Sequence, residues 1–258
     1  MEISTIGIGA SLMAGGATFV GALPVLFLRK MSDRIITIML GFGGGVMLAA
    51  TAFSLLIPGI EAAEQLYGAK WLVLPIITLG LAFGSLLLSL IHRFAPHEHF
   101  IKGVDGSRGS GLARVWLFII AIALHNFPEG LAVGVSFGSE NTSDGIITAL
   151  GIGLQNMPEG LIVAVSLIAE GYRTRYALWV SFLTAIIEPL GSFVGLGLVS
   201  LAKVTLPLAL AFAAGAMLFV ICDEIIPESH QRGKENEGTI GIIAGFITMV
   251  MLDIAFGG

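Results

Sequence analysis

The chain has 258 residues, of which 55% are hydrophobic and 12% are charged, and its mean hydropathy is +0.93. A soluble globular domain carries about a quarter charged residues, so this composition excludes that class and indicates an integral membrane protein. The formal net charge of -5, without a basic patch, argues against nucleic-acid binding. The single cysteine, Cys222, excludes an internal disulfide and a cysteine-rich metal cage.

Long apolar runs follow one another with short connections, so we expect one all-α transmembrane domain, residues 1–258, with eight helices. The N-terminus lacks the positive region of a cleaved signal peptide, and the first run is expected to be retained. Each run is close to the roughly 20 residues needed to cross a bilayer. The expected spans are 4–28, 36–60, 71–92, 115–138, 145–169, 175–199, 205–227 and 239–256.

The longest connection, residues 93–114, contains a Gly/Ser-rich stretch that predicts a flexible linker. It also holds His97 and His99. These two imidazoles are either part of the solvated linker or a weak collecting site for metal ions.

Basic residues predict the orientation in the membrane, because connections rich in Lys and Arg face the cytoplasm. Only Lys70 and Lys203 fall on the opposite side, so both termini are expected outside. The outer connections carry Glu61, Glu64, Glu140 and Asp144, and a negative face raises the local concentration of cations. The basic residues on the cytoplasmic side are Arg29, Lys30, Arg34, Arg93, Lys102, Arg108, Arg114, Arg173, Arg175, Arg232 and Lys234.

Two near-copies of one hexapeptide lie inside apolar runs, HNFPEG at residues 125–130 and QNMPEG at 155–160. Positions i and i+4 share a helix face, so the first and fifth side chains of each copy stack one turn apart. Each proline removes a backbone donor and frees a carbonyl four residues earlier. Polar side chains at membrane depth are costly and usually functional. The alternative is a pair of kinked helices whose polar groups pair with each other.

The hexapeptides share their depth with a third carboxylate. Glu129, Glu159 and Glu188 all fall near the midpoints of their expected spans. Three carboxylates at one depth repel one another unless they are protonated or bridged by cations. The pattern therefore predicts a shared site for divalent cations of borderline hardness. The expected ligands are His125, Asn126, Glu129, Gln155, Asn156, Glu159 and Glu188.

Other polar residues mark a route to and from this depth. Asp223, Glu224, Glu228 and His230 lie at the cytoplasmic end of the seventh expected span and predict an exit. Asp253 lies near the outer end of the eighth and is a candidate entrance group. The alternative for each is an ordinary charge at a helix end.

A weak internal repeat links the second and seventh expected spans. Residues 45–48 read GVML before Pro58, and residues 215–218 read GAML before Pro227. The two spans run in opposite directions, which suggests the inverted repeats of secondary transporters. Small residues four positions apart recur and permit close helix packing, within the chain or in a homodimer.

These motifs resemble the ZIP family of divalent-metal transporters, in particular its GufA-like branch. The resemblance rests on both hexapeptides, on Glu188-Pro189-Leu190-Gly191 and on residues 223–228, and it covers the whole chain. It implies a bundle of eight helices with inverted repeats and outward termini. It also implies a binuclear site. His125, Glu129, Gln155 and Glu159 would hold one cation, and Asn126, Asn156 and Glu188, with Glu129 or Glu159 bridging, would hold the second.

The sequence departs from the commonest family pattern at two of these positions. Gln155 stands where many members have His. The Gln side chain offers an oxygen instead of an imidazole nitrogen, which leaves room for harder or larger ions. Asn156 replaces an acidic residue of some GufA-like members, which predicts a weaker second site.

We therefore expect a transporter in the cell membrane, or the inner membrane of a Gram-negative bacterium, that imports Zn²⁺ or a related cation (Cd²⁺, Fe²⁺, Mn²⁺) by alternating access. It is expected to have no enzymatic activity and no catalytic cofactor. Two rivals stay open. An intramembrane metalloenzyme would also use a His, a Glu and a midplane metal, although the H-E-x-x-H spacing is missing. A cation-coupled exchanger of another solute is the other rival.

Overall fold

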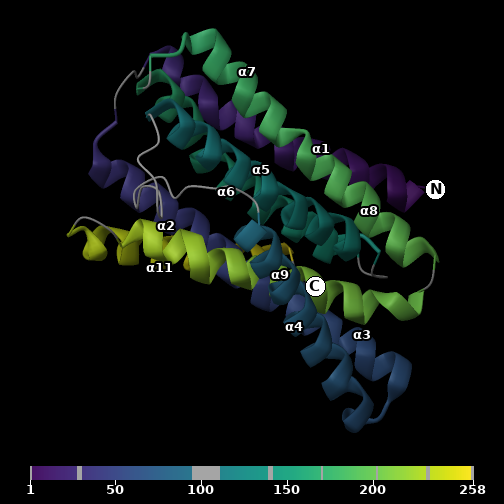
Figure 1. Ribbon diagram of the computed structural model, residues 1–258. Helices are drawn as coiled ribbons and strands as arrows, with labels where there is room; N and C mark the ends of the chain where they lie inside the picture. The colour runs from purple at the N-terminus through teal and green to yellow at the C-terminus, as the bar shows by residue number, and fades with distance from the viewer. Residues whose placement is uncertain are drawn as a thin grey trace.

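The computed structural model describes residues 2–27, 31–94, 111–138, 142–169, 171–201, 203–230 and 233–256. Within these ranges all regular secondary structure is helical (Figure 1). The α-helices are α1 (Glu2–Ala22), α2 (Asp33–Ala50), α3 (Ile57–Tyr67), α4 (Lys70–Phe94), α5 (Gly111–Ser136), α6 (Thr142–Ala169), α7 (Thr174–Ala185), α8 (Ile187–Leu201), α9 (Leu206–Val220), α10 (Ile226–Ser229) and α11 (Glu235–Phe256). Short 3-10 segments are η1 (Leu23–Leu26) and η3 (Lys203–Thr205), and π-helical segments are η2 (Thr51–Leu56) and η4 (Ile221–Ile225).

Seven helical stretches among the described residues are long and apolar enough to cross a bilayer, so the chain is a multi-pass membrane protein. Helix α5 coincides with the expected fourth span but is not among the seven. The total of eight spans and the outward termini therefore stay predictions. The seven stretches are Thr5–Leu26, Asp33–Tyr67, Lys70–Ile91, Thr142–Ile168, Thr174–Val199, Leu206–Ser229 and Glu235–Phe256.

Two expected spans differ from the structure at their proline residues. The second continues through Pro58 to Tyr67, because α3 begins at Ile57 directly after η2 and Pro58 lies in its first turn, where no backbone donor is lost. The helix ends at Gly68, whose φ is 65°. The sixth is broken at Ile186 into α7 and α8. Pro189 then lies in the first turn of α8, where its missing N–H costs nothing.

Close helix pairs hold the bundle together, and glycines form their contacts. α2 packs against α11, α4 against α9, α1 against α6 and α5 against α8. A Cβ added to Gly45 would collide with the carbonyl oxygen of Ile242 in α11, and one added to Gly215 would collide with that of Leu81 in α4. Such backbone approach is the usual basis of helix association in a membrane.

The contacts repeat with an exchange of partners. Gly21 of α1 meets the carbonyl of Met157 in α6, and Gly191 of α8, 170 positions later, meets that of Phe127 in α5. The internal symmetry operation that superimposes α1 on α8 therefore also superimposes α6 on α5. The short connection between α5 and α6 makes these helices antiparallel, so the operation reverses helix direction. This is the arrangement expected of inverted repeats, and η2 and η4 occupy matching places in it.

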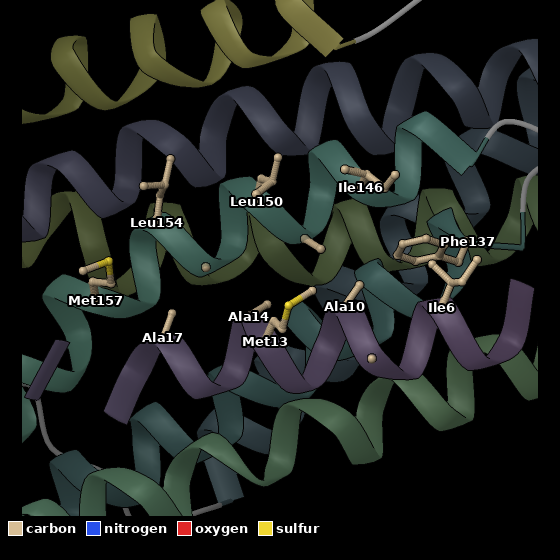
Figure 2. A pocket seen from close by; sticks show the side chains of 13 residues that line it. Ile6, Ala10, Met13, Ala14, Ala17, Phe137, Ile146, Leu150, Leu154 and Met157 are labelled. Atoms are coloured by element: carbon tan, nitrogen blue, oxygen red, sulfur yellow. The ribbon is translucent and has the colours of Figure 1, made fainter. Parts of the chain in front are cut away.

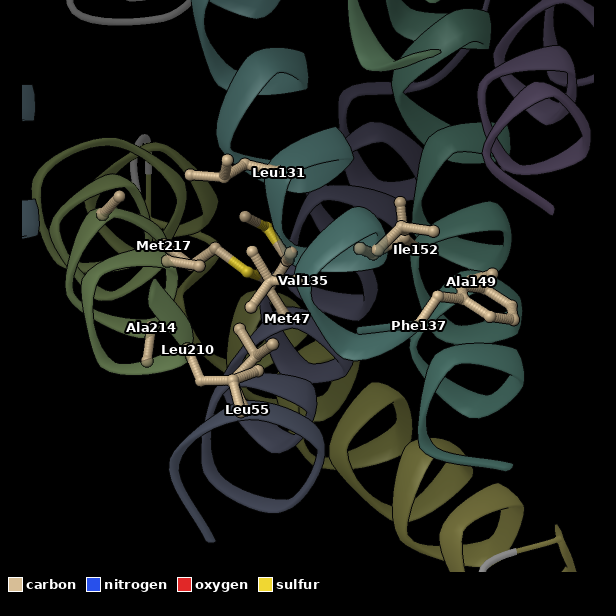
Figure 3. Close-up of a cluster of buried hydrophobic side chains, with 14 of the residues drawn as sticks. Met47, Leu55, Leu131, Val135, Phe137, Ala149, Ile152, Leu210, Ala214 and Met217 are labelled. Carbon is tan, nitrogen blue, oxygen red and sulfur yellow. The ribbon is translucent and has the colours of Figure 1, made fainter. Parts of the chain in front are cut away.

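The largest apolar cluster lies where α2, α5 and α9 meet (Figure 3). Met47 and Leu55 from α2 and η2 face Val135 of α5 and Met217 of α9, and all four side chains are buried. This cluster lies beside the polar residues of the hexapeptides along α5, so it supports the helix that carries the first copy.

An apolar groove of about 720 Å³ runs along the junction of α1 and α6 (Figure 2). Its lining contains no polar side chain, and it lies within two of the membrane-crossing stretches. It therefore faces the hydrocarbon of the bilayer. The lining residues are Ile6, Gly9, Ala10, Met13, Ala14, Ala17, Phe137, Ile146, Ala149, Leu150, Gly153, Leu154 and Met157.

Candidate metal centre

The two hexapeptides lie in the middle of α5 and α6, and both helices continue through Pro128 and Pro158. The structure buries every ligand that the sequence predicts for the midplane site. They are His125, Asn126, Glu129, Gln155, Asn156, Glu159 and Glu188. Polar groups buried at this depth must find partners, because leaving them unpaired costs several kilocalories per mole, on the order of 2–7 kcal/mol each.

Amides from α6 hold two carboxylates that come from other helices. The Gln155 amide nitrogen donates a hydrogen bond to the Glu129 carboxylate of α5. The Asn156 amide nitrogen donates to Oε2 of Glu188 in α8 at 2.6 Å. These contacts join α5, α6 and α8, as the sequence predicts for a shared site.

The two asparagines are held by backbone carbonyls of neighbouring helices. Asn126 Nδ2 donates to the carbonyl oxygen of Thr184 in α7 at 2.8 Å. Asn156 Nδ2 donates to that of Ala14 in α1 at 3.0 Å. Ala14 and Thr184 are 170 positions apart, so these two hydrogen bonds are a further pair related by the internal repeat. Each amide nitrogen is used in this way, which leaves each amide oxygen available.

His125 has a partner that the sequence did not predict for it. Its Nε2 lies 2.9 Å from Oε1 of Glu224, and both side chains are about nine-tenths buried. The π-helical turn η4 carries Glu224, and the wider turn changes the direction of side chains along the span. A residue predicted for the exit thus contacts a residue predicted for the midplane site.

Negative charge is concentrated around these groups. The carboxylate of Glu129 interacts electrostatically with those of Glu159 and Glu188, and His125 with Glu159, Glu224 and Asp223. Like charges this close in a low dielectric destabilise one another. Added positive charge between them would relieve the repulsion.

Five buried oxygen atoms at the site have no hydrogen-bond partner among the described residues. Nearly all buried polar atoms in proteins are paired, so such a group calls for an explanation. All five can only accept, provided that the carboxylates are ionised, and acceptor oxygens are what a hard or borderline cation binds. They are Asn126 Oδ1, Glu129 Oε2, Gln155 Oε1, Asn156 Oδ1 and Glu188 Oε1.

The described residues contain no group of three His, Cys, Asp or Glu side chains placed to hold a metal ion without other ligands.

The residues predicted for the route are spread more widely. Glu228 is buried, Asp223 and Asp253 are half-buried, and Glu224 contacts the predicted midplane ligand His125. His230 has its Nδ1 2.9 Å from the carbonyl oxygen of Ile226 and its Nε2 3.0 Å from Oγ1 of Thr239, so it links α10 to α11. The loop histidines at positions 97 and 99 lie outside the described residues.

Sequence reasoning missed the part that α1 plays. The carbonyl of Ala14 contacts Asn156, but a backbone atom in an apolar helix gives no sequence signal. The internal repeat did contain such a signal. Residues 45–48 and 215–218 are 170 positions apart, and the same offset pairs Ala14 with Thr184 beside the predicted site.

Comparison with known proteins agrees with the geometry. Residues 98–253 match the family described as ZIP Zinc transporter. The chain is 43% identical to "Zinc transporter GufA" of Myxococcus xanthus, over 97% of this chain and 99% of that protein. It is 42% identical to "Zinc transporter ZIPB" of Bordetella bronchiseptica, over 97% and 82%. It is 34% identical to "Zinc transporter ZIP11" of Homo sapiens, over 94% of each. The chain belongs to the ZIP zinc transporter family.

Proposed function

We propose that this protein carries Zn²⁺ or a related divalent cation across the membrane into the cytoplasm, through the buried site formed by α5, α6 and α8. The observation that supports this most directly is the set of five unpaired acceptor oxygens at one depth, contributed by three helices. A divalent cation would satisfy them and would offset the repulsion among Glu129, Glu159 and Glu188.

The donors favour a borderline cation. The site combines one imidazole with carboxylate and amide oxygens, a mixed set of donors that can bind Zn²⁺, Cd²⁺, Fe²⁺ or Mn²⁺. The relatives named above are called zinc transporters, so Zn²⁺ is the first cation to test.

Two cation positions are proposed within the site. His125, Glu129, Gln155 and Glu159 would bind the first, and Glu129 already contacts Gln155. Asn126, Asn156 and Glu188 would bind the second, and Glu188 already contacts Asn156. By the family resemblance, Glu129 or Glu159 would bridge the two positions.

We infer alternating access as the mechanism. Related halves with opposite direction are the usual plan of transporters that expose one midplane site to each side in turn. The contact between His125 and Glu224 connects the first position to the proposed exit residues of η4 and α10. The direction of transport, import, rests on the family resemblance.

Uptake by proteoliposomes tests the proposal. Purified protein is reconstituted around an impermeant zinc-sensitive dye, and Zn²⁺, Cd²⁺, Fe²⁺ or Mn²⁺ is added outside. We expect saturable entry of at least one cation, with competition among them. A protein with Glu129→Gln and Glu159→Gln, reconstituted at equal density, is the matched control. Cation entry no faster than in protein-free liposomes would overturn the proposal.

A further inference from the structure

The first helix touches the metal centre at a glycine. A Cβ added to Gly15 would lie 3.3 Å from Oε2 of Glu188 and 2.7 Å from the carbonyl oxygen of Ala185. The second distance is shorter than real Cβ contacts, so an added methyl group would push α1 away from the end of α7, and at 3.3 Å it would also crowd the Glu188 carboxylate. Gly16, the next residue, has no atom within 4 Å of the same added carbon.

The neighbouring residue binds the same cluster. The carbonyl oxygen of Ala14 accepts a hydrogen bond from Asn156 Nδ2, and that nitrogen also donates to Glu188 Oε2. Residues 14 and 15 of α1 therefore lie against two of the three side chains that we propose for the second cation position, Asn156 and Glu188.

The internal repeat offers an internal control for the choice of glycine. The position equivalent to Gly15 is Ala185, and the position equivalent to Glu188 is Thr18, each 170 positions apart. The equivalence is visible in the packing, since Gly130 meets the carbonyl of Glu188 and Gly160 meets that of Thr18. In the pair formed by Gly15 and Glu188, a glycine accompanies a carboxylate. In the equivalent pair, Ala185 and Thr18, a residue with a methyl group accompanies a shorter side chain. The methyl group that Gly15 lacks relative to Ala185 thus accompanies the carboxylate that Glu188 has and Thr18 lacks.

We propose that α1 is a wall of the second cation position and that Gly15 is a positioning residue for it. The carbonyl of Ala14 fixes the Asn156 amide so that its oxygen stays free, and the bare backbone of Gly15 leaves room for the Glu188 carboxylate beside that amide. This inference rests on the proposed function, because it assigns the residues that hold one of its two cation positions.

Calorimetric titration of the full-length protein in detergent with Zn²⁺ tests the inference, with Gly15→Ala compared to Gly16→Ala. Residues that hold metal ligands in place typically change metal affinity by about 10–100-fold. We expect the affinity for the second cation to fall about tenfold or more in Gly15→Ala, with the first cation bound as in the unsubstituted protein. Gly16→Ala should bind both cations unchanged.

Thermal unfolding with and without Zn²⁺ distinguishes positioning from a packing defect. A positioning role predicts that Gly15→Ala reduces the rise in Tm produced by Zn²⁺ saturation. Equal loss of affinity for both cations, or unchanged binding of both, would overturn the inference. Failure of the unsubstituted protein to bind a second cation would instead overturn the proposed binuclear site.

A second variant covers the case in which Gly15→Ala does not fold. Gly15→Ala combined with Glu188→Thr copies the pair that Ala185 and Thr18 already form in this protein. We expect the combination to fold better than Gly15→Ala alone, measured by size-exclusion chromatography and Tm, because Glu188→Thr removes the carboxylate that the added carbon would meet at 3.3 Å. A combination no better folded than Gly15→Ala alone would place the whole conflict at the carbonyl oxygen of Ala185 and would contradict the role assigned to Gly15.

Discussion

The imidazole Nε2 of His125 in α5 lies 2.9 Å from Oε1 of Glu224 in the π-helical turn η4. One nitrogen cannot contact this carboxylate and bind a cation at the same time. The contact therefore competes with the first proposed cation position, and breaking it is a necessary step whenever His125 takes up a cation through Nε2.

Replacing Glu224 should remove that competition. A hydrogen bond to a charged group contributes about 1 kcal/mol more than one between neutral groups, and about 1 kcal/mol corresponds to roughly fivefold in affinity. We expect Glu224→Gln to raise the affinity for Zn²⁺ about fivefold and to slow its release into the cytoplasm. Calorimetry gives the affinity, and uptake by proteoliposomes gives the rate.

Glu237→Gln is the control, since Glu237 lies outside the candidate metal centre and forms an ion pair with Arg34, with 3.2 Å between Oε1 and Nε. It should leave both quantities unchanged. A weaker affinity in Glu224→Gln would show that Glu224 binds the cation together with His125, contrary to the competition described here.

The helices and the midplane ligands could be predicted from the sequence because the bilayer makes polar residues rare and informative. His125, Glu129, Gln155 and Glu188 stand out inside apolar runs, and the structure buries all four. The paired hexapeptides also predicted which helices face each other. Their roles as cation ligands stay predictions.

Tertiary packing decided what the sequence left open. Whether Glu224 reaches His125 depends on the π-helical turn η4, and no residue pattern in that segment indicated a change of turn. The carbonyls of Ala14 and Thr184 act through the backbone, which every residue shares. The break at Ile186 was also missed, because an apolar run reads the same whether its helix is continuous or broken.

Close backbone contact between α2 and α11 predicts a stability effect. Gly45→Ala would place a methyl group against the carbonyl oxygen of Ile242. Overpacking of this kind typically costs about 1–3 kcal/mol. We expect a lower Tm in detergent for Gly45→Ala, whereas Gly16→Ala, which has open space around it, should keep or raise the Tm. Equal Tm values in the two variants would show that α2 and α11 are less closely packed than described.

The orientation in the membrane predicts which residues an impermeant thiol reagent reaches. Basic connections put residues 93–114 in the cytoplasm and 139–144 outside. In a Cys222→Ser background, Ser139→Cys should be labelled on intact cells and Ser107→Cys only after permeabilisation. The reverse pattern would invert the topology and place the predicted exit on the outer side.

The amide at position 155 predicts metal preference. Gln155→His adds a second imidazole to the first cation position, and imidazole suits Zn²⁺ better than an amide oxygen does. An imidazole N–H can also donate to Glu129 as Gln155 does, so folding should be preserved. We expect Zn²⁺ to rise relative to Mn²⁺ in competition uptake assays. An unchanged ranking of cations would remove Gln155 from the set of ligands.

The carboxylates of Glu129 and Glu159 are expected to bind the cation from facing helices. Glu→Gln at either position keeps the side-chain volume and removes the charge. Changing a residue that only supports a ligand costs about 10–100-fold in metal affinity, so removing a ligand charge should cost at least about tenfold. Folding should survive, because the change relieves repulsion with the remaining carboxylates. Calorimetry and vesicle uptake measure the loss, and Tm without cation checks the fold.

The double substitution shows whether the two carboxylates serve one site. Groups that act as a unit lose function non-additively, so Glu129→Gln with Glu159→Gln should be little worse than either single change. Asp223→Asn is the control, because Asp223 is half-buried in η4 and its loss should affect rate more than affinity. If the double variant kept full affinity and full uptake, the hexapeptides would be structural kinks and the cation would cross the bundle elsewhere.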